Sequence, residues 1–230
     1  AGGALHHVLV TATSTGDAAK KDVAKATTTT ATRRQPDGMI RNSGETTYLG
    51  DNVYNLDGAG QTKAQTVANG VAALYALRVQ NDGNVSDSIN VYGTRGGSGW
   101  TVKYFDSLLA TATDVTDSVT DTAGWTISAL AKDAVKEFRV EVTPDATWGG
   151  GSVRHVTVTA TSPGVTAPTD VVKASTTVAT KRQPDGMIRN PVPDPYAGDN
   201  EYNTTGANQT KLQTVANGVA AVYALKVQND

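Results

Sequence analysis

The sequence predicts an all-β protein, built as an antiparallel β-sandwich and repeated in tandem with a period of 148 residues. Three observations support this prediction. Apolar and polar residues alternate along most of the chain, as they do in half-buried strands. Clusters of Gly, Asn, Asp and Pro interrupt the alternation, as turns do. Residues 149–230 repeat residues 1–82 without a gap, and 55 of the 82 aligned pairs are identical.

The repeat has a constant offset, since His155 matches His7 at 148 positions (155 − 7) and every later pair keeps that spacing. Self-similarity of this kind indicates a tandem array. Only residues 83–148 lack a second copy, so both chain ends fall within a repeat, and we expect a window onto a longer repetitive protein. The alternative is strand exchange between separate subunits. That arrangement leaves the shared domain without residues 83–148 and therefore with unpaired strand edges.

The alternation gives the individual strands. Tyr75, Leu77 and Val79 fall on one face of a predicted strand, and Phe138 and Val140 fall on one face of another. Residues 18–26 have a helical composition, but the matching segment, residues 166–172, contains a Pro and two adjacent Val. We therefore expect a loop and then a strand in both copies. In the complete unit the predicted strands cover residues 38–42, 46–55, 61–68, 71–81, 87–94, 100–106, 113–119, 124–130, 135–143, 153–161 and 171–179.

Short strands at this spacing, with turns between them, are typical of an immunoglobulin-like β-sandwich. The complete domain is predicted to span residues 33–180. It begins at one Arg-Gln-Pro-Asp-Gly segment and ends where the second such segment begins. Residues 1–32 are then the last two strands of a preceding domain. Residues 181–230 are the first strands of a following domain.

Composition excludes several classes of protein. The chain carries 20 Lys and Arg against 22 Asp and Glu, a net charge of −2, which does not suit an electrostatic nucleic-acid binder. No run of residues is apolar for long enough to predict a membrane span. The sequence has no Cys, so disulfide bonds do not stabilise the fold.

One stretch resembles a known kind of domain. The run from Val71 to Val91, with its Asn-Asp-Gly-Asn turn at residues 81–84, is similar to a hairpin of the immunoglobulin-like repeat domains in large surface proteins of bacteria and archaea. Segments 138–144 and 153–161 fit the same pattern. The resemblance covers roughly residues 66–180 and 214–230, whereas residues 34–60 depart from it. It implies an extracellular or cell-surface location and an architectural or adhesive role, and it brings no catalytic centre.

Candidates for catalysis are few, and we predict that the chain is not an enzyme. His6 and His7 are neighbours on a predicted strand, so their side chains point to opposite faces and cannot share a metal ion. A glycosidase needs two carboxylates across a cleft. Glu137 and Glu141 instead share one solvent-facing side of a single strand.

A cluster of oxygen donors follows the first Gly-Met-Ile segment and recurs in the second copy. Carboxylate and amide oxygens are the ligands that calcium prefers. The alternative is a turn in which Asx side chains bond their own backbone, and the second copy has Thr205 in place of one Asp. No other cofactor is expected. The candidate calcium ligands are Asp51, Asn52, Asn55 and Asp57, with Asp199, Asn200 and Asn203 in the second copy.

Three Asn residues fit the N-glycosylation pattern: Asn84, Asn203 and Asn208. In the first copy, Asp57 and Gly60 break the patterns that correspond to the last two. Glycosylation at those sites is therefore not a requirement of the repeat.

These observations favour a structural repeat of an extracellular filament or cell-surface fibre, with copies of itself as partners. The Pro of each Arg-Gln-Pro-Asp-Gly-Met-Ile segment fixes its backbone, so we expect this lead-in to stiffen the joint between neighbouring domains. The alternative is a carbohydrate-binding or adhesive module of a secreted protein. The lead-in residues are Gln35, Pro36, Asp37, Gly38, Met39 and Ile40, and in the second copy Gln183, Pro184, Asp185, Gly186, Met187 and Ile188.

Overall fold

The computed structural model describes residues 1–163 and 169–230. It divides into two compact units, Ala1–Ala179 and Thr180–Asp230. The first unit contains a β-sandwich and a separate hairpin, and the second contains the partial copy of the repeat. The only helix among the described residues, α1, has five residues. No helix within those ranges has the length and hydropathy to cross a bilayer.

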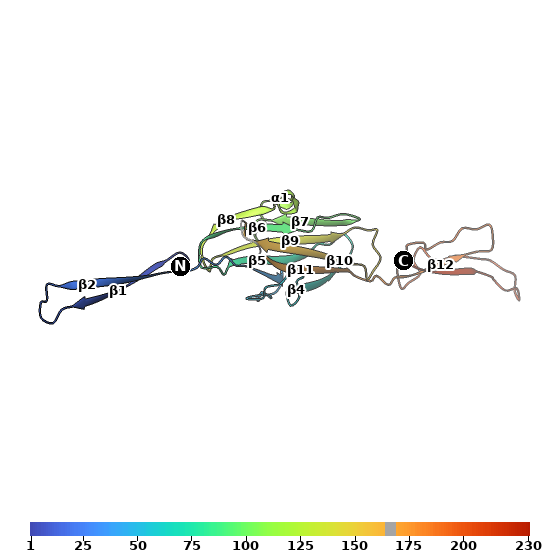
Figure 1. The fold of residues 1–230 in the computed structure, drawn as a ribbon. Helices are drawn as coiled ribbons and strands as arrows, with labels where there is room; N and C mark the ends of the chain where they lie inside the picture. The colour runs from blue at the N-terminus through green and yellow to red at the C-terminus, as the bar shows by residue number, and fades with distance from the viewer. Residues whose placement is uncertain (164–168) are drawn as a thin grey trace. The chain divides into compact units, whose positions relative to one another are not determined.

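The sandwich consists of two sheets (Figure 1). One sheet has the strand order β3-β5-β9-β7 and the other has the order β4-β11-β10-β6-β8. All pairings are antiparallel except that of β11 with β4, which is parallel. The strands of the sandwich are β3 (Pro36–Asn42), β4 (Thr62–Val67), β5 (Ala73–Asn81), β6 (Asp87–Gly93), β7 (Trp100–Phe105), β8 (Trp125–Leu130), β9 (Val135–Pro144), β10 (Val153–Thr161) and β11 (Thr169–Val178).

The inward faces of the two sheets form a single core. Tyr75 and Phe138 from one sheet pack in the same cluster as Val156 and Val158 from the other. The Tyr75 hydroxyl donates to the carbonyl of Ser175 on the opposite sheet at 2.7 Å, so its polar tip is satisfied although the ring is buried. The predicted fold class, an immunoglobulin-like antiparallel β-sandwich, is confirmed, with one parallel pair added.

Two predicted strands are wrong. Residues 46–55 form turns, and only Leu49 makes a bridge, to Ile40. The backbone adopts positive φ at Gly50 (111°) and Asn52 (58°), which lies outside the extended region and turns the chain. Residues 113–119 were expected to be extended. Instead, Thr116–Thr120 form α1, which buries Val119 against the core.

The expected loop and strand near residue 18 are confirmed, because β2 (Lys21–Thr29) begins after a turn. The matching loop in the second copy lies partly outside the described residues. β2 pairs with β1 (Leu5–Thr13) as a two-stranded sheet of its own, and every residue of both strands is exposed.

The second unit repeats part of the sandwich. β12 (Pro184–Arg189) pairs with β13 (Ala224–Asn229) in the register that β3 and β5 use, because Pro184 faces Asn229 as Pro36 faces Asn81. Residues 210–215, the copy of β4, form no strand within this fully described unit. In the sandwich, β4 pairs only with β11, and residues 180–230 contain no copy of that strand.

Candidate docking site

The clearest polar site in the sandwich is the carboxylate of Asp170, near the start of β11. Asp170 is fully buried. Its two oxygens accept hydrogen bonds from the Gly38 amide at 2.7 Å, the Asn55 amide at 3.0 Å and the Gln61 side chain at 2.8 Å. A buried carboxylate is stable only when donors satisfy it. This residue therefore fastens the β10–β11 hairpin to the lead-in segment and to the loop that follows it.

Backbone contacts extend the same attachment. The Lys173 amide donates to the Gln61 carbonyl at 3.0 Å, and beyond it β11 runs parallel to β4 as far as Val178 opposite Val67. Gly38 allows the close approach. A Cβ atom placed there would lie 3.2 Å from a carboxylate oxygen of Asp170 and 3.3 Å from a methyl group of Val172.

The structure places the lead-in residues Gln35–Ile40 mostly inside the sandwich. Pro36–Ile40 belong to β3 and are buried, and Met39 and Ile40 contribute apolar side chains. The lead-in is thus a strand that receives the β10–β11 hairpin. Its expected role in stiffening a joint between domains stays a prediction.

Asp37 is a second buried carboxylate of the lead-in. One of its oxygens accepts the Asn52 amide at 2.9 Å, and the other has no hydrogen-bond partner. Burial raises its pKa to about 7, and the nearby carboxylates of Asp82, Asp170 and Asp51 add to the increase. Asp37 is therefore a group whose charge opposes folding at neutral pH.

The second copy presents the same receiving surface without a hairpin. Asp185 accepts the Asn200 amide at 3.0 Å, as Asp37 accepts that of Asn52. A hollow of about 570 Å³ is lined by Gly186, Asn203 and Gln209, among other residues. These three residues are the copies of Gly38, Asn55 and Gln61, which hold Asp170, and we call them the socket. A Cβ atom at Gly186 would meet nothing within 4 Å.

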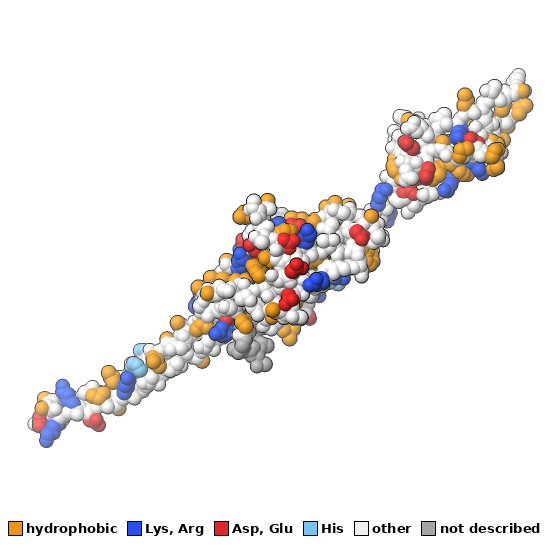
Figure 2. Space-filling view, turned by 90° about the horizontal axis from the view of Figure 1, so that it is seen from above, with side chains coloured by type: hydrophobic (Ala, Val, Ile, Leu, Met, Phe, Trp, Pro, Cys, Tyr) orange, Lys and Arg blue, Asp and Glu red, His pale blue; other side chains and the backbone are white. Residues whose placement is uncertain are grey.

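The first hairpin, β1–β2, is folded, but among the described residues no receiving surface lies against it. Its residue Asp22, the copy of Asp170, is exposed, and its side chain accepts only the neighbouring Val23 amide at 2.9 Å. Val8 and Val10 are 50% and 64% exposed, whereas their copies Val156 and Val158 are at most 4% exposed. Figure 2 shows hydrophobic side chains spaced along this hairpin, which the pale blue His residues mark.

Asn84 joins the first hairpin to the sandwich. Its side chain accepts the Arg33 amide at 2.8 Å and donates to the Ala31 carbonyl at 2.9 Å. Its own carbonyl accepts the Gly2 amide at 2.9 Å. Glycosylation at Asn84 would remove a hydrogen of the amide that makes one of these contacts. These contacts place Asn84 at the base of the hairpin, and its glycosylation stays a prediction.

The other two candidate glycosylation sites are exposed. The Asn203 side chain already bonds within its own turn, donating to the Ala207 carbonyl at 2.8 Å. Asn208 has a positive φ of 60° and is free of such a turn bond, although its amide lies 3.5 Å from Glu201. Glycosylation of both stays a prediction.

The candidate calcium ligands bond mainly to backbone. The Asn55 side chain accepts the Gly58 amide at 2.6 Å, and Asp57 accepts the Ala59 amide at 2.9 Å. This is the Asx-turn arrangement weighed as the alternative. Within the described ranges, no three His, Asp or Glu side chains gather as metal ligands do. Calcium binding by Asp51, Asn52, Asn55 and Asp57 and by their copies stays a prediction.

Three further side chains weighed for catalysis or metal binding, Glu137, Glu141 and His7, make structural contacts. Glu137 accepts from Arg78 at 2.7 Å and from the Tyr48 hydroxyl at 3.1 Å, and Arg78 holds the pKa of Glu137 below its usual value. Glu141 pairs with Arg139 at 2.8 Å. His7 bonds Thr27 across the first hairpin at 3.0 Å.

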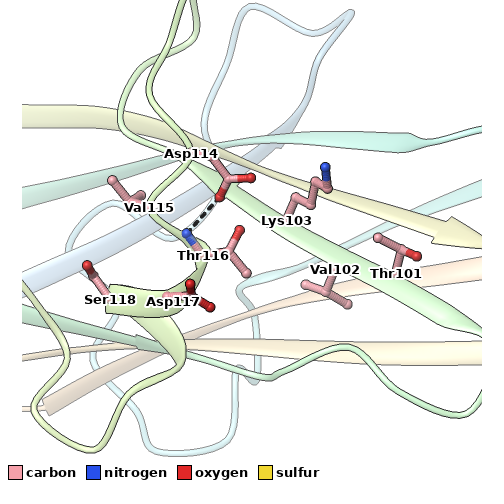
Figure 3. Close-up of a pocket in the computed structure, with 8 residues that line it drawn as sticks. All are labelled: Thr101, Val102, Lys103, Asp114, Val115, Thr116, Asp117 and Ser118. Carbon is pink, nitrogen blue, oxygen red and sulfur yellow. Dashed lines mark hydrogen bonds between the residues drawn. The ribbon is translucent and has the colours of Figure 1, made fainter.

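A shallow pocket beside α1 was not foreseen from the sequence. Its lining includes Lys103, Asp114 and Asp117 (Figure 3). Asp114 accepts the Thr116 amide at 2.9 Å, and the hydrogen bonds from Thr116 lower its pKa. That carboxylate therefore stays charged and serves the start of the helix, which is a structural use of the group.

Comparison with known proteins does not assign the chain to a family. No protein-family model matches the sequence, and no curated protein matches it. Among solved structures, a family 123 glycoside hydrolase from Clostridium perfringens is similar, with a TM-score of 0.39 and 10% identity, over 66% of this chain and 28% of that one. The major pilin subunit BcpA of Bacillus cereus has a TM-score of 0.38 and 8% identity, over 96% of this chain and 63% of that one.

A PapD-like domain of human CEP192 has a TM-score of 0.31 and 8% identity, over 63% of this chain and 84% of that domain. The chain thus spans less than a third of the hydrolase and less than two thirds of the pilin subunit. At these scores the likenesses do not place the chain in any family.

Proposed function

We propose that this chain is a structural subunit or repeat of an extracellular filament or cell-surface fibre, built from tandem or strand-exchanging β-sandwich domains, with no catalytic role. One observation carries the proposal. Two related copies of one hairpin differ in burial, since β10–β11 has alternate residues buried inside a complete sandwich and β1–β2 has every residue exposed. A hairpin that is core in one copy and bare in the other is suited to completing a further sandwich.

The order of the elements supports linear assembly. Only residues 179–183 separate the end of β11 from β12, so each sandwich is followed almost at once by the receiving strands of the next repeat. Repeats of this kind bury their hydrophobic faces against neighbouring material and form quasi-linear arrays. A surface location and copies of the chain as partners are part of this proposal.

Two aromatic side chains, Tyr48 and Trp148, are engaged in packing, whereas Tyr54, Tyr202 and Tyr223 are 41%, 43% and 37% exposed. A sugar-binding surface needs exposed aromatic faces. The Tyr48 ring lies under Arg41 and Arg78, whose guanidinium carbons are 5.0 Å and 4.1 Å from its centre. Trp148 packs beside Trp100 with ring centres 6.0 Å apart. These rings are used for packing.

Electron microscopy tests the proposal. We expect the purified chain, concentrated stepwise, to form thin unbranched fibres of uniform width, with sedimentation showing growth in mass as concentration rises. A single species of 23.8 kDa at every concentration, without fibres, would contradict assembly by this chain. A glycan array provides the rival test, since saturable binding to one sugar class without assembly would favour the adhesive module.

A further inference from the structure

We infer that the β1–β2 hairpin of one copy inserts into the socket of a second copy of this chain, with the Asp22 carboxylate bound by Gly186, Asn203 and Gln209. The inference rests on the proposed function, because it names the contact that joins the units. It commits to a second copy as the occupant of the socket.

The exposed hairpin corresponds residue by residue to the hairpin that fills the complete sandwich. Asp22 corresponds to Asp170, and the hairpin around it keeps the same register, because Asp22 faces Ala12 as Asp170 faces Ala160. The hairpin is therefore already folded in the shape that the sandwich accepts. An exposed sheet edge with apolar side chains is a ready template for pairing.

The empty socket already has part of the hydrogen bonding of the filled site. Gln209 donates to the Glu201 carbonyl, as Gln61 donates to that of Val53. The Asp230 amide bonds the Gln183 carbonyl at 2.9 Å, as Asp82 bonds Gln35 at 2.8 Å. The hollow over Gly186 lies where Asp170 and Val172 contact Gly38 in the sandwich.

A segment without a strand partner follows the socket residues in the sequence. Residues 210–215 form no strand, whereas their copy β4 forms one by pairing in parallel with β11. The β13 face is also bare, with Leu225 74% and Val227 77% exposed, whereas Leu77 and Val79 are at most 2% exposed. A docked hairpin would pair with the first segment and cover apolar side chains near the second.

The hydrogen bonds that hold Asp170 do not involve residues 83–148. All three donors to Asp170 from outside its own hairpin lie within residues 38–61, and β4 follows them at once. Residues 83–148 contact the hairpin through β6, which pairs with the other edge of β10, and through core side chains such as Phe138. The hairpin and the socket are different surfaces, so the contact is heterologous and can continue from chain to chain as an open polymer.

The register of the complete sandwich allows a specific cross-linking test. Ser175 lies opposite Ala64 in the β11–β4 pair, and the copies of these two residues are Thr27 and Leu212. The chain has no Cys, so Thr27→Cys and Leu212→Cys can be placed in separate full-length chains that are mixed and oxidised. Thr27→Cys mixed with Gln213→Cys is the matched control, because adjacent side chains on a strand point to opposite faces.

We expect Thr27→Cys with Leu212→Cys to form at least ten times more disulfide-linked heterodimer than the control, Thr27→Cys with Gln213→Cys. Introducing Asp22→Asn into the hairpin chain should reduce that yield about tenfold, because an amide in that position sets its own donors against the donors of the socket. Asp17→Asn, which also removes one exposed hairpin charge, should leave the yield within twofold. A yield equal for both Cys pairs, or unaffected by Asp22→Asn, would overturn the inference.

The outcomes separate the inference from the proposed function. Fibres without register-specific cross-links would overturn the hairpin contact and leave the filament standing on another interface. Specific cross-links without fibres would support the contact and count against the filament. Insertion of the hairpin into the socket of its own chain would give no heterodimer and would also overturn the inference.

Discussion

The two hairpins of this chain, β1–β2 and β10–β11, have closely related sequences but opposite environments. Every residue of the first is exposed, while alternate residues of the second are buried in the core. Because both form the same paired strands, the difference lies in what surrounds them. Hairpin formation is local in this protein, and burial depends on a receiving surface elsewhere in the chain.

The largest expected effect comes from comparing the buried Asp170 with its exposed copy, Asp22. Asp170→Ala leaves the amides of Gly38 and Asn55 and the Gln61 side chain without their acceptor, so we expect the sandwich to lose about 3–5 kcal/mol of unfolding free energy. Asp22→Ala at the exposed copy should change it by less than about 0.5 kcal/mol. Urea unfolding followed by Trp fluorescence measures both, because all three Trp residues lie within residues 100–148.

Both variants must be measured in dilute solution, because assembly of the chains would bury Asp22. Equal losses for the two variants would mean that the exposed hairpin contributes to the stability of the sandwich, and the comparison between the two environments would fail.

The next effect compares apolar residues at the same position of the hairpin. Val156→Ala removes two methyl groups from a fully buried site and should cost about 2 kcal/mol. Val8→Ala, at its exposed copy, should cost less than about 0.5 kcal/mol in the dilute chain. The same urea titrations measure both. If Val8→Ala were the more damaging substitution, the hairpin would have to be packed against the protein in solution.

The strands of the sandwich could largely be predicted because period-two alternation reports half-buried strands directly. The two errors show where that signal is ambiguous. Residues 113–119 are too short for the two periods to differ clearly, and one buried residue, Val119, suffices to anchor a five-residue helix. Residues 46–55 contain alternating residues, but positive φ at Gly50 and Asn52 turns the chain back, and side-chain bonds hold it there.

The sequence predicted only part of the candidate docking site: it identified the lead-in residues but not Asp170 or Gln61. Identity between the copies drew attention to the lead-in, but alternation says nothing about an acid that follows a loop and is buried by donors 109–132 residues away. Asp170 and Gln61 are both identical in the two copies. Identity alone does not say that the carboxylate of one meets the amide of the other, because the partnership depends on the parallel β11–β4 pair.

A pH effect is expected from the lead-in carboxylate. Asp37 has a folded-state pKa of about 7 against an ordinary value of 3.8, so the folded protein binds its proton more tightly than the unfolded chain does. Stability contributed by this group is therefore greatest below about pH 4 and is lost as pH rises to about 7. Asp37→Asn should remove that slope and stabilise the sandwich at pH 8 by about 1–2 kcal/mol.

The measurement is the difference in urea midpoint between the two proteins from pH 4 to pH 8. Taking the difference matters because Glu137 and Asp114, whose pKa values are lowered, give the opposite trend at acid pH in both proteins. A constant difference across that range would mean that Asp37 titrates as an ordinary exposed carboxylate.

The smallest effect concerns the two glycines beneath the hairpin position. Gly38→Ala should cost the sandwich about 1–2 kcal/mol, since the new methyl group lies 3.2 Å from the Asp170 carboxylate and 3.3 Å from Val172. Gly186→Ala meets nothing within 4 Å, so far-UV circular dichroism and the Trp-monitored unfolding of the dilute chain should stay at the parent values. The same methyl group should weaken assembly, because it occupies the space that an incoming Asp22 needs. A Gly186→Ala chain that assembled as well as its parent would mean that no hairpin closes over this glycine. Adding the same methyl group at Gly38 and at Gly186 therefore distinguishes a site that a hairpin fills from one that is empty in the dilute chain.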